Sequence, residues 1–213
     1  AKLVGSHIGS FPTMTLAWWK SASPWQRWQY AFTRHPITVV NAYFTAFFLE
    51  MCVLSFKRSP RKRWDSLLAA FVVVGLAVAV SLKVGFGVWF WAVFLPHYFA
   101  CAVGAYLFYA QHNYPELEIQ PRETWSYDRA ALHSSSYMEL GPVLAWFTAN
   151  IGYHHVHHLN PGIPFYRLPE AMAALPELQS PGKTTLSPSS IAACFRLKLW
   201  DAEAGRMVGY PAA

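Results

Sequence analysis

Four of the nine histidines in this 213-residue chain fall within five consecutive positions, in the string HHVHH. In a helix, positions i, i+3 and i+4 share one face, so His154, His157 and His158 would point the same way. His155 would lie about 100° round the axis, as a neighbouring or surface group. Converging imidazoles repel one another when protonated, whereas neutral imidazole is a good ligand for iron, zinc, copper and nickel. The spacing therefore predicts a metal site, with a surface histidine cluster as the alternative.

A further histidine stands where it can contribute to such a site. His112 comes just after a long apolar run, where a helix end can face the cluster, so we expect it to be a fourth ligand. Polar neighbours would orient the ligands by accepting their other ring proton. The candidates for this supporting role, or for an additional ligand, are Asn150, His155, His133, Glu123 and Asp128. For each of them, an ordinary capping, packing or surface role is the alternative.

Apolar residues dominate the composition and gather in long runs. Hydrophobic residues make up 54% of the chain and charged residues 13%, against about 25% charged residues in ordinary soluble domains. This excludes a disordered chain, a coiled coil and a highly charged soluble module. Residues 66–82 and 84–110 contain no Asp, Glu, Lys or Arg, and a bilayer core needs about 17 to 20 apolar helical residues. We predict transmembrane helices over 66–82 and 86–109, because a small soluble domain has little room to bury both.

Basic residues indicate the orientation of this hairpin. Loops rich in Lys and Arg normally stay cytoplasmic, and the segment 57–63 carries five such residues, Lys57, Arg58, Arg61, Lys62 and Arg63. They act as a topology signal, or they bind an acidic partner protein or anionic lipid headgroups. The apolar stretch 37–56 contains Glu50, whose charge is costly at membrane depth. We therefore expect 37–56 to be interfacial or re-entrant.

Together these patterns predict an all-α membrane protein. Residues 1–36 would form a cytoplasmic or interfacial segment, and 37–110 the membrane region with its transmembrane helical hairpin. Residues 111–213 would form a cytoplasmic helical cap that carries the metal ligands. Within this cap, the Ser- and Pro-rich segment 179–190 is expected to be a flexible linker.

Two motifs resemble a known family. The string NIGYHHVHHLNPGIPFYRLPEA at 150–171 resembles the third histidine box, HxxHH, of the membrane fatty acid desaturases, and is most similar to bacterial enzymes of the delta-12 or omega-6 kind. The string FYAQHNYPE at 108–116 resembles the family's FYxQH element at the end of the last membrane helix. SSY at 135–137 and LKLWDAEAGRMVGY at 197–210 also fit, so the resemblance extends over essentially the whole chain.

The resemblance implies a di-iron oxidoreductase of lipid metabolism that uses O2. Members of the family bind two irons through eight or nine histidines on the cytoplasmic side of the membrane. The third box would supply His154, His157 and His158, and the QH element His112. The substrate would be a fatty acyl lipid, an acyl-CoA or another acyl carrier, and a ferredoxin or cytochrome b5-like protein would deliver electrons. We expect the bacterial inner membrane as its location and no nucleic-acid partner.

The chain departs from the family pattern in one respect, because the first two boxes, HxxxH and HxxHH, are not found in it. We expect Ala1 to follow closely on the second box of a longer protein, and the 213 residues alone to be inert. The first alternative is a lipid or carotenoid hydroxylase or ketolase of the same histidine-box type. The second is a non-catalytic membrane protein that binds a metal ion or heme.

Overall fold

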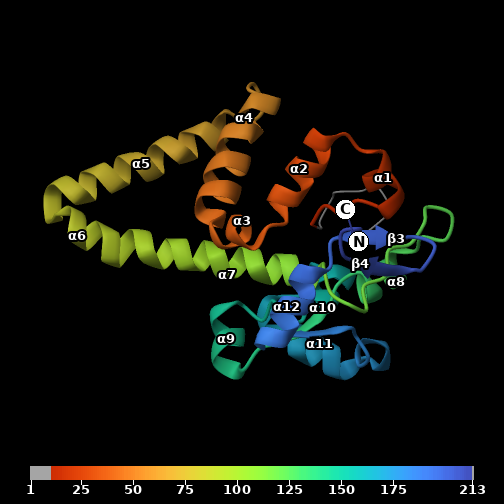
Figure 1. The fold of residues 1–213 in the computed structure, drawn as a ribbon. Helices are drawn as coiled ribbons and strands as arrows, with labels where there is room; N and C mark the ends of the chain where they lie inside the picture. The colour runs from red at the N-terminus through yellow and green to blue at the C-terminus, as the bar shows by residue number, and fades with distance from the viewer. Residues whose placement is uncertain (1–10, 213) are drawn as a thin grey trace. The chain divides into compact units, whose positions relative to one another are not determined.

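The computed structural model describes residues 11–212. These residues are mostly helical and fall into two compact units (Figure 1). One unit is His35–Tyr106, and the other combines the chain up to Arg34 with the chain from Leu107 onward. Residues 1–10 of the predicted segment 1–36 lie outside the described part of the chain.

The unit His35–Tyr106 is a succession of helices. Its elements are α3 (Pro36–Val40), the π-helical η1 (Tyr43–Leu54), α4 (Ser55–Arg58), α5 (Trp64–Val84), α6 (Phe86–Trp89), the π-helical η2 (Phe90–Phe94) and α7 (Leu95–Gln111), whose last turn belongs to the other unit. The chain reverses between α5 and α6 at Gly85, whose φ of 98° lies in the left-handed region that only glycine adopts freely. This reversal makes α5 and the continuous helical run of α6, η2 and α7 the two sides of a hairpin.

Two helices in the described part of the chain are long and apolar enough to cross a membrane. They are Trp64–Val84, with a mean hydropathy of 2.5, and Phe86–Gln111, with a mean hydropathy of 1.5. Their bounds enclose the predicted spans 66–82 and 86–109. In the most apolar 18-residue window of each helix no residue is buried by the rest of the chain, as expected for residues that face lipid.

The one acidic residue of the stretch 37–56 is paired. The Arg58 guanidinium donates to both carboxylate oxygens of Glu50, from Nη1 to Oε1 at 2.5 Å and from Nη2 to Oε2 at 3.3 Å. Such pairing reduces the cost of a carboxylate close to lipid. The other basic residues of the predicted loop are exposed: Lys57, Arg61, Lys62 and Arg63. That 37–56 does not cross the membrane stays a prediction.

The second unit contains short helices and, contrary to the all-α expectation, two small sheets. Its helices are α1 (Leu16–Ser21), α2 (Pro24–Thr33), α8 (Tyr127–His133), α9 (Pro142–Phe147), α10 (His154–Leu159), η3 (Phe165–Arg167), α11 (Leu168–Ala174), η4 (Pro176–Leu178) and α12 (Pro188–Arg196). Strand β1 (Tyr137–Glu139) pairs in parallel with β2 (Lys183–Thr185), and β3 (Leu199–Asp201) pairs antiparallel with β4 (Arg206–Val208). Strands of three residues are too short to leave an alternating pattern in a sequence.

Parts of the segment 179–190 form regular structure, and the expectation of a flexible linker is wrong. It contains β2 and the start of α12, where the Ser187 side chain accepts from Ser190 N as an N-cap. A Cβ on Gly182 would lie 2.5 Å from the ring of Tyr114, so glycine permits a close approach at this position. The Ser, Pro and Gly residues here serve capping and packing.

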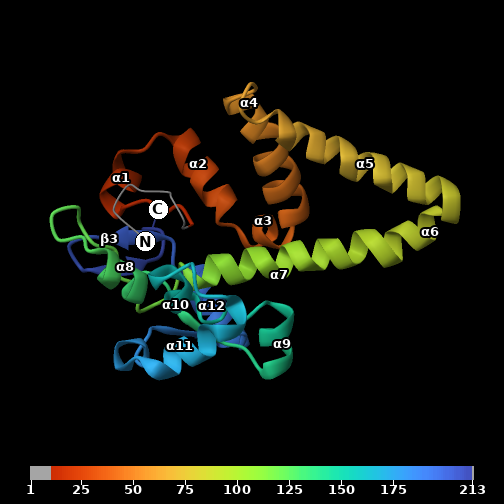
Figure 2. The ribbon, with the colours of Figure 1, turned by 180° about the vertical axis from the view of Figure 1, so that it is seen from behind.

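One side chain anchors α10 in the interior of this unit. Val156 is fully buried and packs against Leu168 at the start of α11 and Leu178 in η4. Figures 1 and 2 show α10 beside α11 in both views, in agreement with their contacts. The helix that carries the histidine string is therefore fixed by its apolar face.

Candidate metal centre

A tight turn leads into α10. Ala149 and Asn150 have positive φ values of 52° and 54°, which turn the chain back after α9. Met138 N then donates to Gly152 O at 2.9 Å, and a Cβ on Gly152 would lie only 2.5 Å from Met138 O. This close approach of β1 to the loop fixes the backbone two residues before His154.

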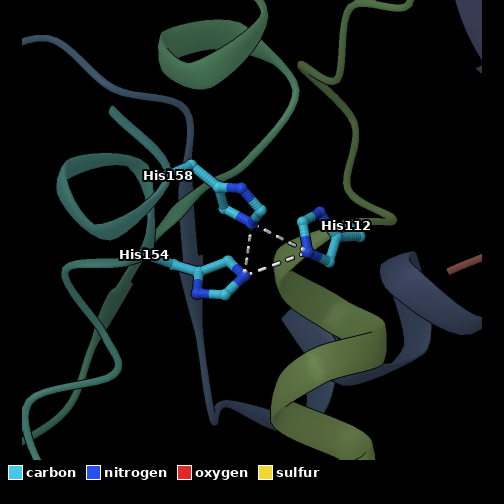
Figure 3. A group of neighbouring side chains, drawn as sticks. All are labelled: His112, His154 and His158. Carbon is cyan, nitrogen blue, oxygen red and sulfur yellow. Dashed lines mark hydrogen bonds between the residues drawn. The ribbon is translucent and has the colours of Figure 1, made fainter. Parts of the chain in front are cut away.

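Three histidines from two distant segments converge. His112 directly follows α7, while His154 and His158 lie one turn apart on α10 (Figure 3). The Nε2 atoms of His154 and His112 are 3.0 Å apart, those of His158 and His154 3.1 Å, and those of His158 and His112 3.3 Å. His112 and His154 are buried, at 1% and 5% exposure.

Hydrogen bonds alone cannot satisfy this triangle. A neutral imidazole nitrogen either donates its proton or accepts with its lone pair, never both. Among three mutually contacting nitrogens, at least two therefore play the same role and oppose each other. A metal ion accepts all three lone pairs at once. Nitrogens about 2.0–2.1 Å from one ion lie roughly 2.9–3.4 Å from one another, a range that includes the observed 3.0–3.3 Å.

The surroundings keep His154 and His158 neutral and orient His112. Burial, with a smaller effect of the neighbouring histidines, holds the pKa of His154 well below its usual range. Burial likewise lowers the pKa of His158 to about 4. The Nδ1 atom of His112 lies 3.2 Å from Ser134 O, which places the ring proton on Nδ1 and leaves the Nε2 lone pair facing the other two histidines. Neutral imidazoles that present a lone pair are the form that metals bind.

Residues 9–188 match the family model described as Fatty acid desaturase. The chain belongs to the fatty acid desaturase family. It is also 33% identical, over 210 residues, to the protein named "Fatty acid desaturase" of Bacillus subtilis (strain 168). That alignment covers 96% of this chain and 58% of the relative, so the chain spans less than two thirds of the relative's length. The desaturase family is a membrane-bound oxidoreductase family, and the predicted family resemblance is confirmed.

In this desaturase-family chain, His157 lies outside the triangle. Its ring centroid is 5.9 Å from that of His154 and 6.0 Å from that of His158, and the ring is partly exposed. The i, i+4 pair of α10 therefore converges with His112, while the i+3 histidine points to the side. Of the four predicted ligands, the structure brings three together.

The remaining candidates have other surroundings. His155 is fully buried, and its Nε2 lies 3.2 Å from Leu178 O. Asn150 donates from Nδ2 to Phe165 O at 3.1 Å. His133 ends α8, where its carbonyl accepts from Tyr114 at 2.9 Å. Glu123 and Asp128 are exposed. Among the described residues, the group of neighbouring metal-ligating side chains is limited to His112, His154 and His158.

The sequence does not reveal the partner of His112. It is the carbonyl of Ser134, and a backbone acceptor leaves no mark in the residue type. Ser134 is buried, with its Oγ donating to Glu118 O at 2.7 Å, and its neighbours Ser135 and Ser136 are buried as well. Three consecutive serines at the end of α8 are the one signal in the sequence that could have drawn attention to this place.

Proposed function

We propose that this protein is a fatty acyl desaturase that introduces a double bond into the acyl chain of a membrane lipid, using two irons and O2. The observation that supports this most is the triangle of Nε2 atoms of His112, His154 and His158, 3.0–3.3 Å apart in a chain of the desaturase family. Neutral imidazole suits iron among other metals. The histidine triangle is a donor set that fits the proposed ion.

We assign His112, His154 and His158 to one iron and His157 to the second. The ring of His157 lies outside the triangle, with its centroid 5.9 Å from that of His154 and 6.0 Å from that of His158, and this position supports the division. Three imidazoles do not fill the coordination shell of an iron, and two irons need more ligands than four histidines offer. Other residues must therefore complete both sites.

The overall reaction removes two hydrogens from adjacent methylenes of the acyl chain. Together with two electrons and two protons, these hydrogens reduce O2 to two molecules of water. Bound iron would supply the oxidising power toward unactivated C–H bonds that no side chain possesses. The contribution of this chain is to present lone pairs: the Ser134 carbonyl holds the proton of His112 on Nδ1, and burial keeps His154 and His158 neutral.

The substrate class follows from the family and the apolar helices. The acyl tail of a fatty acyl lipid, an acyl-CoA or another acyl carrier would enter from the bilayer that α5 and α6–α7 are long enough to span. Electrons would come from a ferredoxin or a cytochrome b5-like protein. The exposed basic residues of 57–63 favour the cytoplasmic side for their loop. Two crossings, by α5 and by α6–α7, would return the chain to that same side, so we place the metal site there. The bacterial inner membrane is the proposed location.

Fatty-acid profiling tests this function. Cells that express the full-length gene should accumulate mono- or di-unsaturated acyl chains that control cells lack, and His154→Ala should abolish them. The control variant is His35→Asn, since His35 is an exposed histidine whose Nδ1 caps Ile37 N and asparagine retains that cap. Hydroxylated or oxidised lipids in place of unsaturated ones would identify a hydroxylase or ketolase of the same metal type. No change in any lipid would contradict the proposal.

A further inference from the structure

Arg34, directly after α2, carries a positive charge that is completely buried. It is 0% exposed, and within the described residues no carboxylate forms an ion pair with it. Its Nη1 donates to Pro12 O at 2.5 Å, and its Nη2 donates to Asn113 Oδ1. Three aromatic rings surround it, with centroids 5.2–5.4 Å from Cζ: Phe11, Tyr30 and Tyr109.

Burying a cation without an anion beside it costs free energy, and an apolar side chain in its place often gives equal or greater stability. A purely stabilising role is therefore a poor account of Arg34.

The side chain that Arg34 holds is itself fully engaged. Asn113 is 0% exposed, and its Nδ2 donates to Cys194 O at 2.6 Å, to Leu197 O at 3.0 Å and to Tyr109 Oη at 3.1 Å. Its Oδ1 accepts from Arg34 because its amide group is committed to these partners. The amide is thus locked in one orientation between the end of α7 and the end of α12.

Asn113 is the residue next to the metal ligand His112. The backbone of this turn is closed by His112 N donating to Tyr109 O at 3.2 Å and Asn113 N donating to Ala110 O at 3.2 Å. From the guanidinium to the imidazole, each step is a hydrogen bond or a peptide bond between buried groups. We propose that Arg34 is a positioning residue of the metal site, which acts through Asn113 to set the place of the His112 imidazole. This inference rests on the proposed metal site.

The chemistry of arginine suits this task. Its planar fork donates in two fixed directions, so Pro12 O and Asn113 Oδ1 are held at a set angle to each other. A lysine ammonium in the same place is a point charge that does not reproduce the fork. Cation–π contacts with three aromatic rings hold the guanidinium group of Arg34 in place without a carboxylate partner. A carboxylate at this position would itself attract metal ions and compete with the histidines. The result is a rigid support for the backbone turn that carries His112.

Cobalt binding measures this effect without reference to activity. The full-length protein, stripped of metal in detergent, is titrated with Co²⁺ and followed by visible absorption. Arg34→Met should weaken cobalt binding about tenfold or more, in line with the roughly 10–100-fold cost of losing groups that orient metal ligands. Arg34→Lys keeps the buried charge and tests the inference if Arg34→Met does not fold. It should weaken cobalt binding to a smaller extent than Arg34→Met.

Tyr30→Phe is the matched control. It removes the hydroxyl that accepts from Met14 N at 3.0 Å and donates to Lys198 O, but keeps the ring over Arg34 and leaves Asn113 untouched. It should lower the melting temperature while leaving the cobalt titration unchanged. If Tyr30→Phe lost as much cobalt affinity as Arg34→Met, the inference would be overturned. General destabilisation of the residues around Arg34 would then explain both losses.

A double variant separates this inference from the function on which it rests. In a His112→Ala background, Arg34→Met should change cobalt affinity no further, since the ligand through which it acts is gone. An equal effect of Arg34→Met with and without His112 overturns the positioning role but leaves the metal site intact. If His112→Ala alone leaves cobalt binding unchanged, the proposed metal site itself is wrong.

Discussion

The Nε2 atoms of His112 and His154 lie 3.0 Å apart, although the two histidines are 42 positions apart in the chain. The first follows α7 and the second begins α10, and the whole of 113–153 lies between them. Neither helix end defines a metal site by itself. The site exists because the fold brings the residue that follows α7 next to α10, a short helix held by Val156.

The triangle and its neighbour predict a difference between two adjacent histidines of α10. His158→Ala removes a member of the triangle and should reduce metal affinity by more than about 100-fold, beyond the cost of losing an orienting group. His157→Ala should leave this first ion bound and lose only a second one. Metal content of the full-length variants, measured by mass spectrometry after dialysis, distinguishes the two. Equal metal loss in both variants would contradict the division between two ions.

The parts of this site that can be predicted from the sequence are those that depend on residues close together in the chain or on local composition. The pairing of His154 with His158 follows from helical periodicity, and the involvement of His112 follows from its place after an apolar run. The exclusion of His157 is not predictable in this way, because it depends on which side of α10 faces the end of α7. That choice is made by Val156, whose burial against α11 and η4 sets the rotation of the helix.

The limits of sequence reasoning on the fold have a similar cause. The two long apolar helices are predictable nearly to their ends, because membrane spans depend on local composition alone. The parallel pair of β1 and β2 joins residues 46 positions apart, such as Tyr137 and Lys183, and each strand has three residues. No local pattern records such a pairing, so composition alone favours a linker at 179–190.

His155, the buried neighbour of the ligands, should matter for stability and not for metal binding. It is 0% exposed, and its Nε2 faces Leu178 O at 3.2 Å. His155→Ala leaves a cavity and an unpaired carbonyl, and we expect a loss of about 2–4 kcal/mol. Thermal unfolding in detergent should show a clear drop in melting temperature, while the metal content at saturation stays unchanged. Loss of metal from a variant with unchanged melting temperature would make His155 a ligand.

Lys198 predicts a pH dependence of stability. Burial, with a smaller effect of Arg34, lowers the pKa of Lys198 to about 8, below its usual value of 10.5. Between these two values the unfolded chain holds a proton that the folded chain has released, so stability conferred by this residue rises with pH from about 8 to 10.5. Relative to Lys198→Met, the wild-type protein should therefore gain in melting temperature between pH 7.5 and 9.5. A constant difference over that interval would mean that the ammonium stays charged in the folded protein.

The 213 residues on their own should not form the complete metal centre. Among the described residues, three histidines face one point, and His157 is the one further predicted ligand within the string. Two irons cannot be held in closed sites by four imidazoles, so the isolated chain should bind fewer than two irons and produce no unsaturated acyl chains. Iron analysis of the purified chain, together with lipid profiling of cells that express it alone, measures both quantities. A content close to two irons per chain, together with desaturation, would contradict this prediction. It would show that this chain supplies every ligand that the centre requires, including ligands other than His112, His154, His157 and His158.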